Sequence, residues 1–79
     1  MLKNVGFEIL LASPPEYTNL VAEVYFEGRF VARVCQERGP GLFDVEMPGC
    51  GLVESKVQRK VDLLGFLSTL KAACDRLSQ

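Results

Sequence analysis

The chain has 79 residues, of which 48% are hydrophobic and 24% charged, the balance of one small folded domain over residues 1–79 and not of a disordered segment. Nine basic and ten acidic side chains give a net charge of −1, so no strong field favours nucleic acid or an anionic membrane as the main partner. The chain contains no His, which excludes Ser-His and Cys-His catalytic pairs and removes the commonest metal ligand.

The first predicted strand covers residues 5–12, where apolar side chains occupy every second position. One face of this strand carries Val5, Phe7, Ile9 and Leu11. Pro14 and Pro15 end the strand, because consecutive prolines remove donors from a sheet ladder.

A hairpin is predicted next, with its turn at residues 27–29. The first strand presents Leu20, Ala22, Val24 and Phe26 on one face, and the second presents Phe30, Ala32 and Val34. Because a slip of one residue turns every side chain over, matching these faces favours a three-residue loop in which Gly28 supplies the positive φ. The same register places Glu23 and Arg33 together on the other face.

A fourth strand is predicted over residues 42–47, after the break at Gly39-Pro40-Gly41. Its inward side chains are Phe43, Val45 and Met47, and its outward ones are Leu42, Asp44 and Glu46. A fifth strand over residues 56–61 is a further option, since Val57 and Val61 bracket Arg59.

The last predicted element is an amphipathic helix that begins after residue 62. Its apolar positions recur at steps of three and four residues, at Leu63, Phe66, Leu67, Leu70, Cys74 and Leu77. Asp62 stands at the N-cap, where its charge also suits the helix dipole. Gly65 is expected to let the first turn pack closely on the sheet.

These elements predict a two-layer α+β domain, in which the C-terminal helix packs on one face of an antiparallel meander of four or five strands. The predicted core comprises Phe7, Ile9, Val24, Phe26, Phe30, Val34, Phe43, Val45, Phe66, Leu67 and Leu70. Because so small a core gives little net stability, association into a homodimer would help the domain.

The three cysteines predict no disulfide framework and no cofactor or metal site. Cys35, Cys50 and Cys74 are odd in number and have no Cys-x-x-Cys spacing. The apolar run after Lys3 is interrupted by Glu8, which is not the pattern of a signal peptide, and no run approaches the roughly 20 apolar residues of a membrane span. We therefore expect a reduced, cytoplasmic protein with no membrane partner.

Two groups of charged residues have a chemical interpretation beside a structural one. Asp44 and Glu46 share a strand face about 7 Å apart, where they could act as acid and base or hold a divalent cation, or simply face water. Lys56, Arg59 and Lys60 could contact phosphate or form a solvated basic loop. The solvated interpretation is favoured for both groups, and we expect no enzyme and no direct contact with nucleic acid.

The sheet face opposite the helix is the predicted binding surface. Apolar residues are interleaved with charged ones there, and the residues assigned to protein binding are Glu23, Tyr25, Val31, Arg33, Asp44 and Glu46. Tyr and Arg are enriched at binding hot spots, and aliphatic neighbours exclude water around them. The alternative is that these residues only reflect the preference of Val and Tyr for strands.

The order of elements resembles that of small bacterial immunity proteins, which bind a toxin domain and block its site. The resemblance rests on the stretches Ala22–Gly28, Phe30–Val34, Phe43–Glu46 and Val61–Phe66. Phage anti-CRISPR proteins are similar in size and in their sheet with one helix. No functional residue is carried over from either family.

The leading hypothesis is therefore a non-enzymatic inhibitor that binds a protein, of the immunity type, with Tyr25 and Val31 as anchors and with Glu23, Asp44 and Glu46 facing basic groups of the target. The second is an anti-CRISPR-type inhibitor of a host nucleoprotein complex. The third is a small enzyme or ligand-binding domain that uses Cys35, Cys50 or the Asp44 and Glu46 pair.

Overall fold

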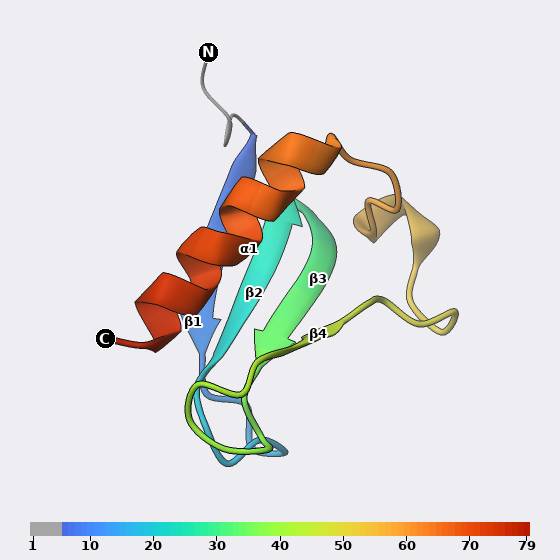
Figure 1. Cartoon of the computed structure of the whole chain (residues 1–79). Coiled ribbons are helices and arrows are strands. Elements are labelled where there is room, and N and C mark those ends of the chain that lie inside the picture. Colours follow the sequence, from blue (N-terminus) through green and yellow to red (C-terminus); the bar gives the residue numbers. More distant parts are fainter. Residues whose placement is uncertain (1–5) are drawn as a thin grey trace.

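A four-stranded antiparallel sheet with one helix on one of its faces makes up the computed structural model, which describes residues 6–79 (Figure 1). In chain order the elements are β1 (Phe7–Ala12), β2 (Val21–Phe26), β3 (Arg29–Cys35), β4 (Asp44–Glu46), the short 3-10 helix η1 (Glu54–Lys56) and α1 (Leu63–Leu77). The strands lie in the order β1-β2-β3-β4, which confirms the predicted α+β meander with a C-terminal helix. Val5, assigned to the first strand from its pattern, lies outside the described residues.

The core lies between α1 and the sheet, and the helix packs on β1 and β2 more than on β3. Its fully buried members are small, namely Ala22, Val24, Val31, Ala32 and Val34 from the sheet and Ala73 from the helix. Larger side chains pack around them, including Phe7, Ile9, Phe26, Phe43, Phe66 and Leu70. The predicted strand alternation is confirmed for β1, where Glu8 and Leu10 are exposed and their neighbours are not.

Five residues predicted for the core face of the sheet or for the apolar stripe of the helix are exposed instead. They are Leu20 (48% exposed), Val45 (48%), Met47 (60%), Leu63 (66%) and Leu67 (51%). Within the described residues α1 makes no contact with β4, so the helix side of β4 is uncovered. The helix is also rotated relative to its predicted stripe, since Gly65 and Thr69 are buried and face the sheet. The fourth strand itself is shorter than predicted, because only Asp44–Glu46 pairs with β3.

The hairpin register is confirmed in its central part, where Glu23 lies opposite Arg33 and Val24 lies opposite Ala32. The three-residue loop is wrong. The turn consists of two residues, Glu27 and Gly28, whose φ values are 50° and 83°. Positive φ at both positions is the geometry of the tight type I′ turn, whose twist suits a hairpin.

A β-bulge reconciles the short turn with the matched faces. Pairing passes from Val24 with Ala32 to Tyr25 with Phe30, so Val31 has no partner of its own. Val31 is therefore buried in the core, whereas Phe30 contacts Tyr25 on the opposite face. The predicted faces of Phe30 and Val31 are both wrong for this reason.

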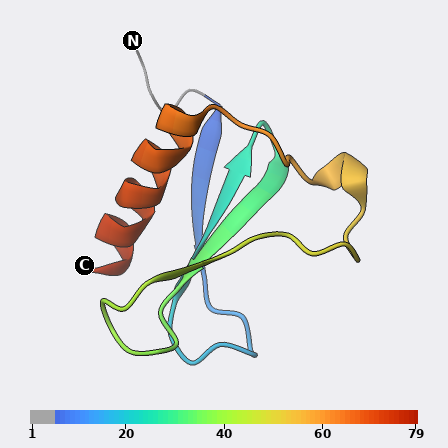
Figure 2. The ribbon, with the colours of Figure 1, turned by 45° about the vertical axis from the view of Figure 1, so that its right-hand side comes forward.

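Residues 56–61 do not form a fifth strand. η1 ends at Lys56, and Val57 makes a single parallel bridge to Phe30. The backbone N–H of Gln58 donates to the carbonyl oxygen of Phe30 at 2.9 Å. β4 pairs only with Arg33–Cys35 of β3. The contacts of Val57 and Gln58 with Phe30 therefore cover the other half of that edge of β3. Figure 2 shows η1 on the side of the sheet away from α1.

The start of α1 is capped as predicted. The Asp62 carboxylate accepts a hydrogen bond from the backbone N–H of Gly65 at 2.7 Å. Gly65 is buried, as close packing of the first turn requires. Near the other end, Arg76 donates to the carbonyl oxygen of Ile9 at 3.3 Å and links the helix to β1.

Candidate functional site

The sheet face opposite α1, called the open face below, is organised around Arg33. The Arg33 guanidinium donates to the Glu23 carboxylate at 3.0 Å and to the Tyr17 hydroxyl at 3.1 Å. Tyr17 in turn donates to Glu46, and Arg33 lies 3.7 Å from the same carboxylate. Tyr25 donates to the second oxygen of Glu23 at 3.1 Å. We call these five residues the arginine cluster.

Contacts within the arginine cluster shift the pKa values of Arg33, Tyr17 and Tyr25. Burial acts to lower the pKa of Arg33, but hydrogen bonds to Glu23 and Tyr17 outweigh it and raise that pKa. The pKa of Tyr17 is raised by its hydrogen bond to Glu46, and that of Tyr25 by burial and then by its hydrogen bond to Glu23. Arg33 thus stands between the two carboxylates of the cluster, at 3.0 Å from Glu23 and 3.7 Å from Glu46.

Tyr17 reaches the cluster because its loop is fixed to the loop that follows β3. The Glu37 carboxylate accepts from the backbone N–H groups of Thr18 at 2.7 Å and Asn19 at 2.9 Å. These bonds, first that of Thr18, hold the pKa of Glu37 below its ordinary value. Gln36 adds a hydrogen bond to the carbonyl oxygen of Leu20. Both loops lie at the same end of the sheet in Figures 1 and 2.

The predicted carboxylate pair is divided between two arginines. Arg38 donates twice to Asp44, both at 2.9 Å, and this contact holds the pKa of Asp44 below its ordinary value. Glu46 belongs instead to the arginine cluster. Among the described residues no three His, Cys, Asp or Glu side chains are grouped so that they could hold a metal ion.

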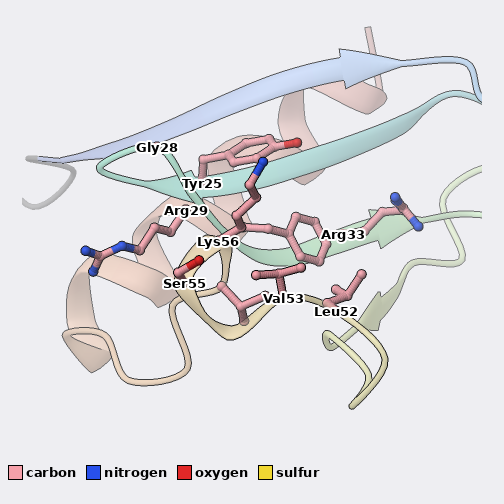
Figure 3. Close-up of a pocket in the computed structure, with 10 residues that line it drawn as sticks. Tyr25, Gly28, Arg29, Arg33, Leu52, Val53, Ser55 and Lys56 are labelled. Carbon is pink, nitrogen blue, oxygen red and sulfur yellow. The ribbon is translucent and has the colours of Figure 1, made fainter.

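A groove lies beside the arginine cluster, with a volume of about 580 Å³. Tyr25 and Phe30 contribute aromatic rings in edge-to-face contact, with centroids 5.8 Å apart. Leu52, Val53 and Val57 add an apolar wall, and Arg29, Arg33 and Lys56 add three cations. In Figure 3, Arg29 and Arg33 lie at opposite ends of the groove and the Lys56 ammonium points toward Tyr25.

The three cations of the groove differ in how they are compensated. Arg33 is neutralised by Glu23, and its guanidinium also lies 5.7 Å from the centroid of the Phe30 ring. Arg29 donates to the neutral side chain of Gln58 at 3.0 Å. Within residues 6–79 neither Arg29 nor Lys56 forms an ion pair, so two positive charges of the groove lining have no acidic partner there.

Lys56 and Arg59, two residues of the predicted basic loop, have different surroundings. Arg59 is held by Glu54, at 2.7 Å, and by the carbonyl oxygens of Pro48 and Gly49. Arg59 thereby closes the loop that carries the groove's apolar wall. Lys56 points into the groove, so Lys56 and Arg59 do not act as one phosphate-binding patch.

The predicted binding residues are brought together only in part. Glu23, Tyr25, Arg33 and Glu46 meet on the open face, and Asp44 lies at its β4 edge, bound to Arg38. Val31 is wrong as a binding residue on this face, because the bulge turns it into the core, where it is 2% exposed.

The groove residues outside the hairpin, in particular Leu52 and Val53, were not predicted from the sequence. Tyr17 and Phe30 were also missed as part of this face. A pattern of period two cannot place a loop on a sheet, and only a bulge next to the turn would have moved Phe30 to the open face.

Cys35 is buried and Cys74 is half-buried, and both resemble structural cysteines. Burial raises the pKa of Cys35 and of Cys74, which is the opposite of the activation that a nucleophilic thiol needs. Cys50 is exposed, and all three thiols are free of disulfides.

Comparisons of the chain with models of protein families, with curated proteins and with solved structures found no match. In the part of the chain that the structure describes, α1 and η1 both lack the length and apolar character of a membrane-spanning helix.

Proposed function

We propose that this chain is a non-enzymatic inhibitor that binds a partner protein and covers that protein's active or binding site, in the manner of an immunity protein. The contact surface is the open face together with the groove beside the arginine cluster.

One observation carries this proposal, namely the composition of the groove. Aromatic and arginine side chains stand beside Leu52 and Val53, which are 47% and 61% exposed. Tyr, Arg and exposed aliphatic residues around a concave site are typical of the desolvated centre of a protein interface. The arginine cluster supplies a polar rim on one side of the groove, where each of its members is held by a hydrogen bond to another member.

The electrostatics of the proposed contact differ from those expected from the sequence. Glu23, Asp44 and Glu46 were assigned to basic groups of the target. Glu23 and Asp44 are each bound to an arginine of this chain, and Glu46 accepts a hydrogen bond from Tyr17. Among the charged residues that line the groove, those without an ion pair within residues 6–79 are Arg29 and Lys56. The proposed contact therefore attracts acidic groups of the partner.

The test is capture of the partner from lysate of the native cell, followed by an assay of the partner's activity. Wild-type protein should retain one protein and inhibit it. The variant Phe30→Ala/Lys56→Glu should retain at least tenfold less of it, because the groove loses an aromatic ring and a cation together.

Leu64→Ala is the matched control, since Leu64 is 69% exposed on α1, on the other side of the sheet. The control should retain as much partner as the wild type. Equal recovery by the groove variant, or recovery of a partner whose activity is unchanged, would contradict the proposal. Recovery of a nucleoprotein complex would instead support the anti-CRISPR-type alternative.

A further inference from the structure

We infer that the groove binds a segment of the partner protein that presents a large apolar side chain flanked by carboxylates. This inference rests on the proposed function and names the chemistry of the partner at the same site.

The apolar half of the groove sets the first requirement. Leu52 and Val53 are exposed large hydrophobic residues, and they line the groove together with the Tyr25 and Phe30 rings. A volume of about 580 Å³ has room for a side chain such as Trp, Phe or Leu together with part of its backbone. Filling the groove would remove this apolar surface from water.

The charges of the groove set the second requirement. Arg29 and Lys56 have no ion-pair partner among residues 6–79, whereas the acidic side chains Glu23 and Glu54 are bound to arginines. Of residues 6–79, no Asp or Glu is among those that line the groove, and Glu8 lies outside the lining, opposite Tyr25 on β1. An occupant with an apolar body alone would leave two cations partly desolvated without compensation, which costs free energy. Carboxylates on either side of the apolar side chain would compensate them.

A protein segment fits this groove better than a nucleic acid does. The two rings contact each other edge to face, with an angle of 69° between their planes, so they do not form parallel platforms for successive bases. The chain has a net charge of −1, and two free cations do not make a track along a phosphate backbone.

The inference is tested by titrating the ¹⁵N-labelled protein with an acetylated, amidated peptide of sequence Gly-Asp-Glu-Trp-Glu-Asp-Gly and following its amide NMR signals. We expect saturable shifts at Gly28, Arg29 and residues 52–57. A peptide with Lys in place of the four acidic residues should bind at least tenfold more weakly. A peptide with Gly in place of Trp should also bind at least tenfold more weakly.

The protein variant for this test is Arg29→Glu/Lys56→Glu, which should reduce the affinity for the acidic peptide at least tenfold. Lys60→Glu/Lys71→Glu is the matched control, since it changes the net charge equally outside the groove lining. Its affinity should fall less than twofold. Both variants change only exposed residues and leave the core unchanged. The amide spectrum of each variant shows directly whether it is folded.

Several outcomes would overturn the inference. These are shifts that map outside the groove, equal binding of the acidic and basic peptides, equal losses in the two protein variants, and tighter binding of a ten-residue oligothymidine than of the acidic peptide. If the acidic peptide does not bind but capture of the native partner still depends on Phe30 and Lys56, the partner's chemistry is wrong and the proposed function stands. If capture does not depend on them, the proposed function itself fails.

Discussion

The two faces of the sheet are built in opposite ways. On the helix side, small apolar residues such as Ala22, Val24 and Ala32 meet α1, and their spacing along each strand places them there. On the open face, side chains from distant segments meet, because Tyr17 comes from a loop and Val57 from the segment before α1. The helix side thus supplies the packed core, whereas the open face gathers the charged and aromatic side chains on which the proposed contact rests.

The largest expected effect comes from the core itself. Val24→Ala should lower the free energy of unfolding by about 2–3 kcal/mol, since Val24 is fully buried and its lost methyl groups leave a cavity. Val53→Ala makes the same chemical change in the groove, where it should stay within about 0.5 kcal/mol of the wild type. Urea denaturation of both variants measures the contrast, and equal losses would remove the distinction between the two faces.

The arginine cluster should stabilise the fold less than the core does. Arg33→Met leaves the Glu23 carboxylate, which is only 13% exposed, without its cation. We expect a loss of about 1–2 kcal/mol in the free energy of unfolding. In a double-mutant cycle, the added change Glu23→Gln should restore part of this loss. Additive losses would show that the two side chains do not interact in solution.

The helix cap should contribute about 1 kcal/mol. Asp62→Ala removes the acceptor for the N–H of Gly65, and Asp62→Asn keeps an acceptor at the same position. We expect Asp62→Ala to be the less stable of the two in thermal unfolding. The same stability in both variants would argue that the cap does not hold the start of α1.

The smallest expected effect is a pH dependence of stability that comes from Glu37, whose carboxylate holds the loop that carries Tyr17. The pKa of Glu37 is lowered in the folded chain by the N–H groups of Thr18 and Asn19. Stability from such a group is present above its unfolded pKa and is lost as the pH falls through the folded one. Between about pH 5 and pH 3, urea denaturation should therefore show a larger loss for the wild type than for Glu37→Gln. Parallel losses would contradict this role of Glu37.

The sequence was informative where burial follows a simple period. The alternation of Phe7, Ile9 and Leu11 and the cap at Asp62 predicted β1 and the start of α1 correctly. The same reasoning failed at Phe30 and Val31, because one bulged residue reverses the faces beyond it. It also placed Val45 in the core, since periodicity does not say how far one helix extends across a sheet.

Only part of the candidate site followed from the sequence. The opposition of Glu23 and Arg33 was predicted from the register of the hairpin and is confirmed. The groove was not predicted, because its wall at Leu52 and Val53 lies in a segment without regular periodicity. The loop that carries this wall is held by Arg59, whose carbonyl contacts have no signal in the sequence.

The most direct test of the account compares two phenylalanines on opposite faces, Phe30 in the groove and Phe66 in the core. The measurement is the amount of partner protein retained per folded molecule by Phe30→Ala and by Phe66→Ala, at a temperature where both are folded by their amide spectra. The account predicts that Phe66→Ala is the less stable variant but retains the partner as the wild type does, whereas Phe30→Ala loses at least tenfold of it. Retention by Phe30→Ala, or an equal loss in both variants, would contradict it.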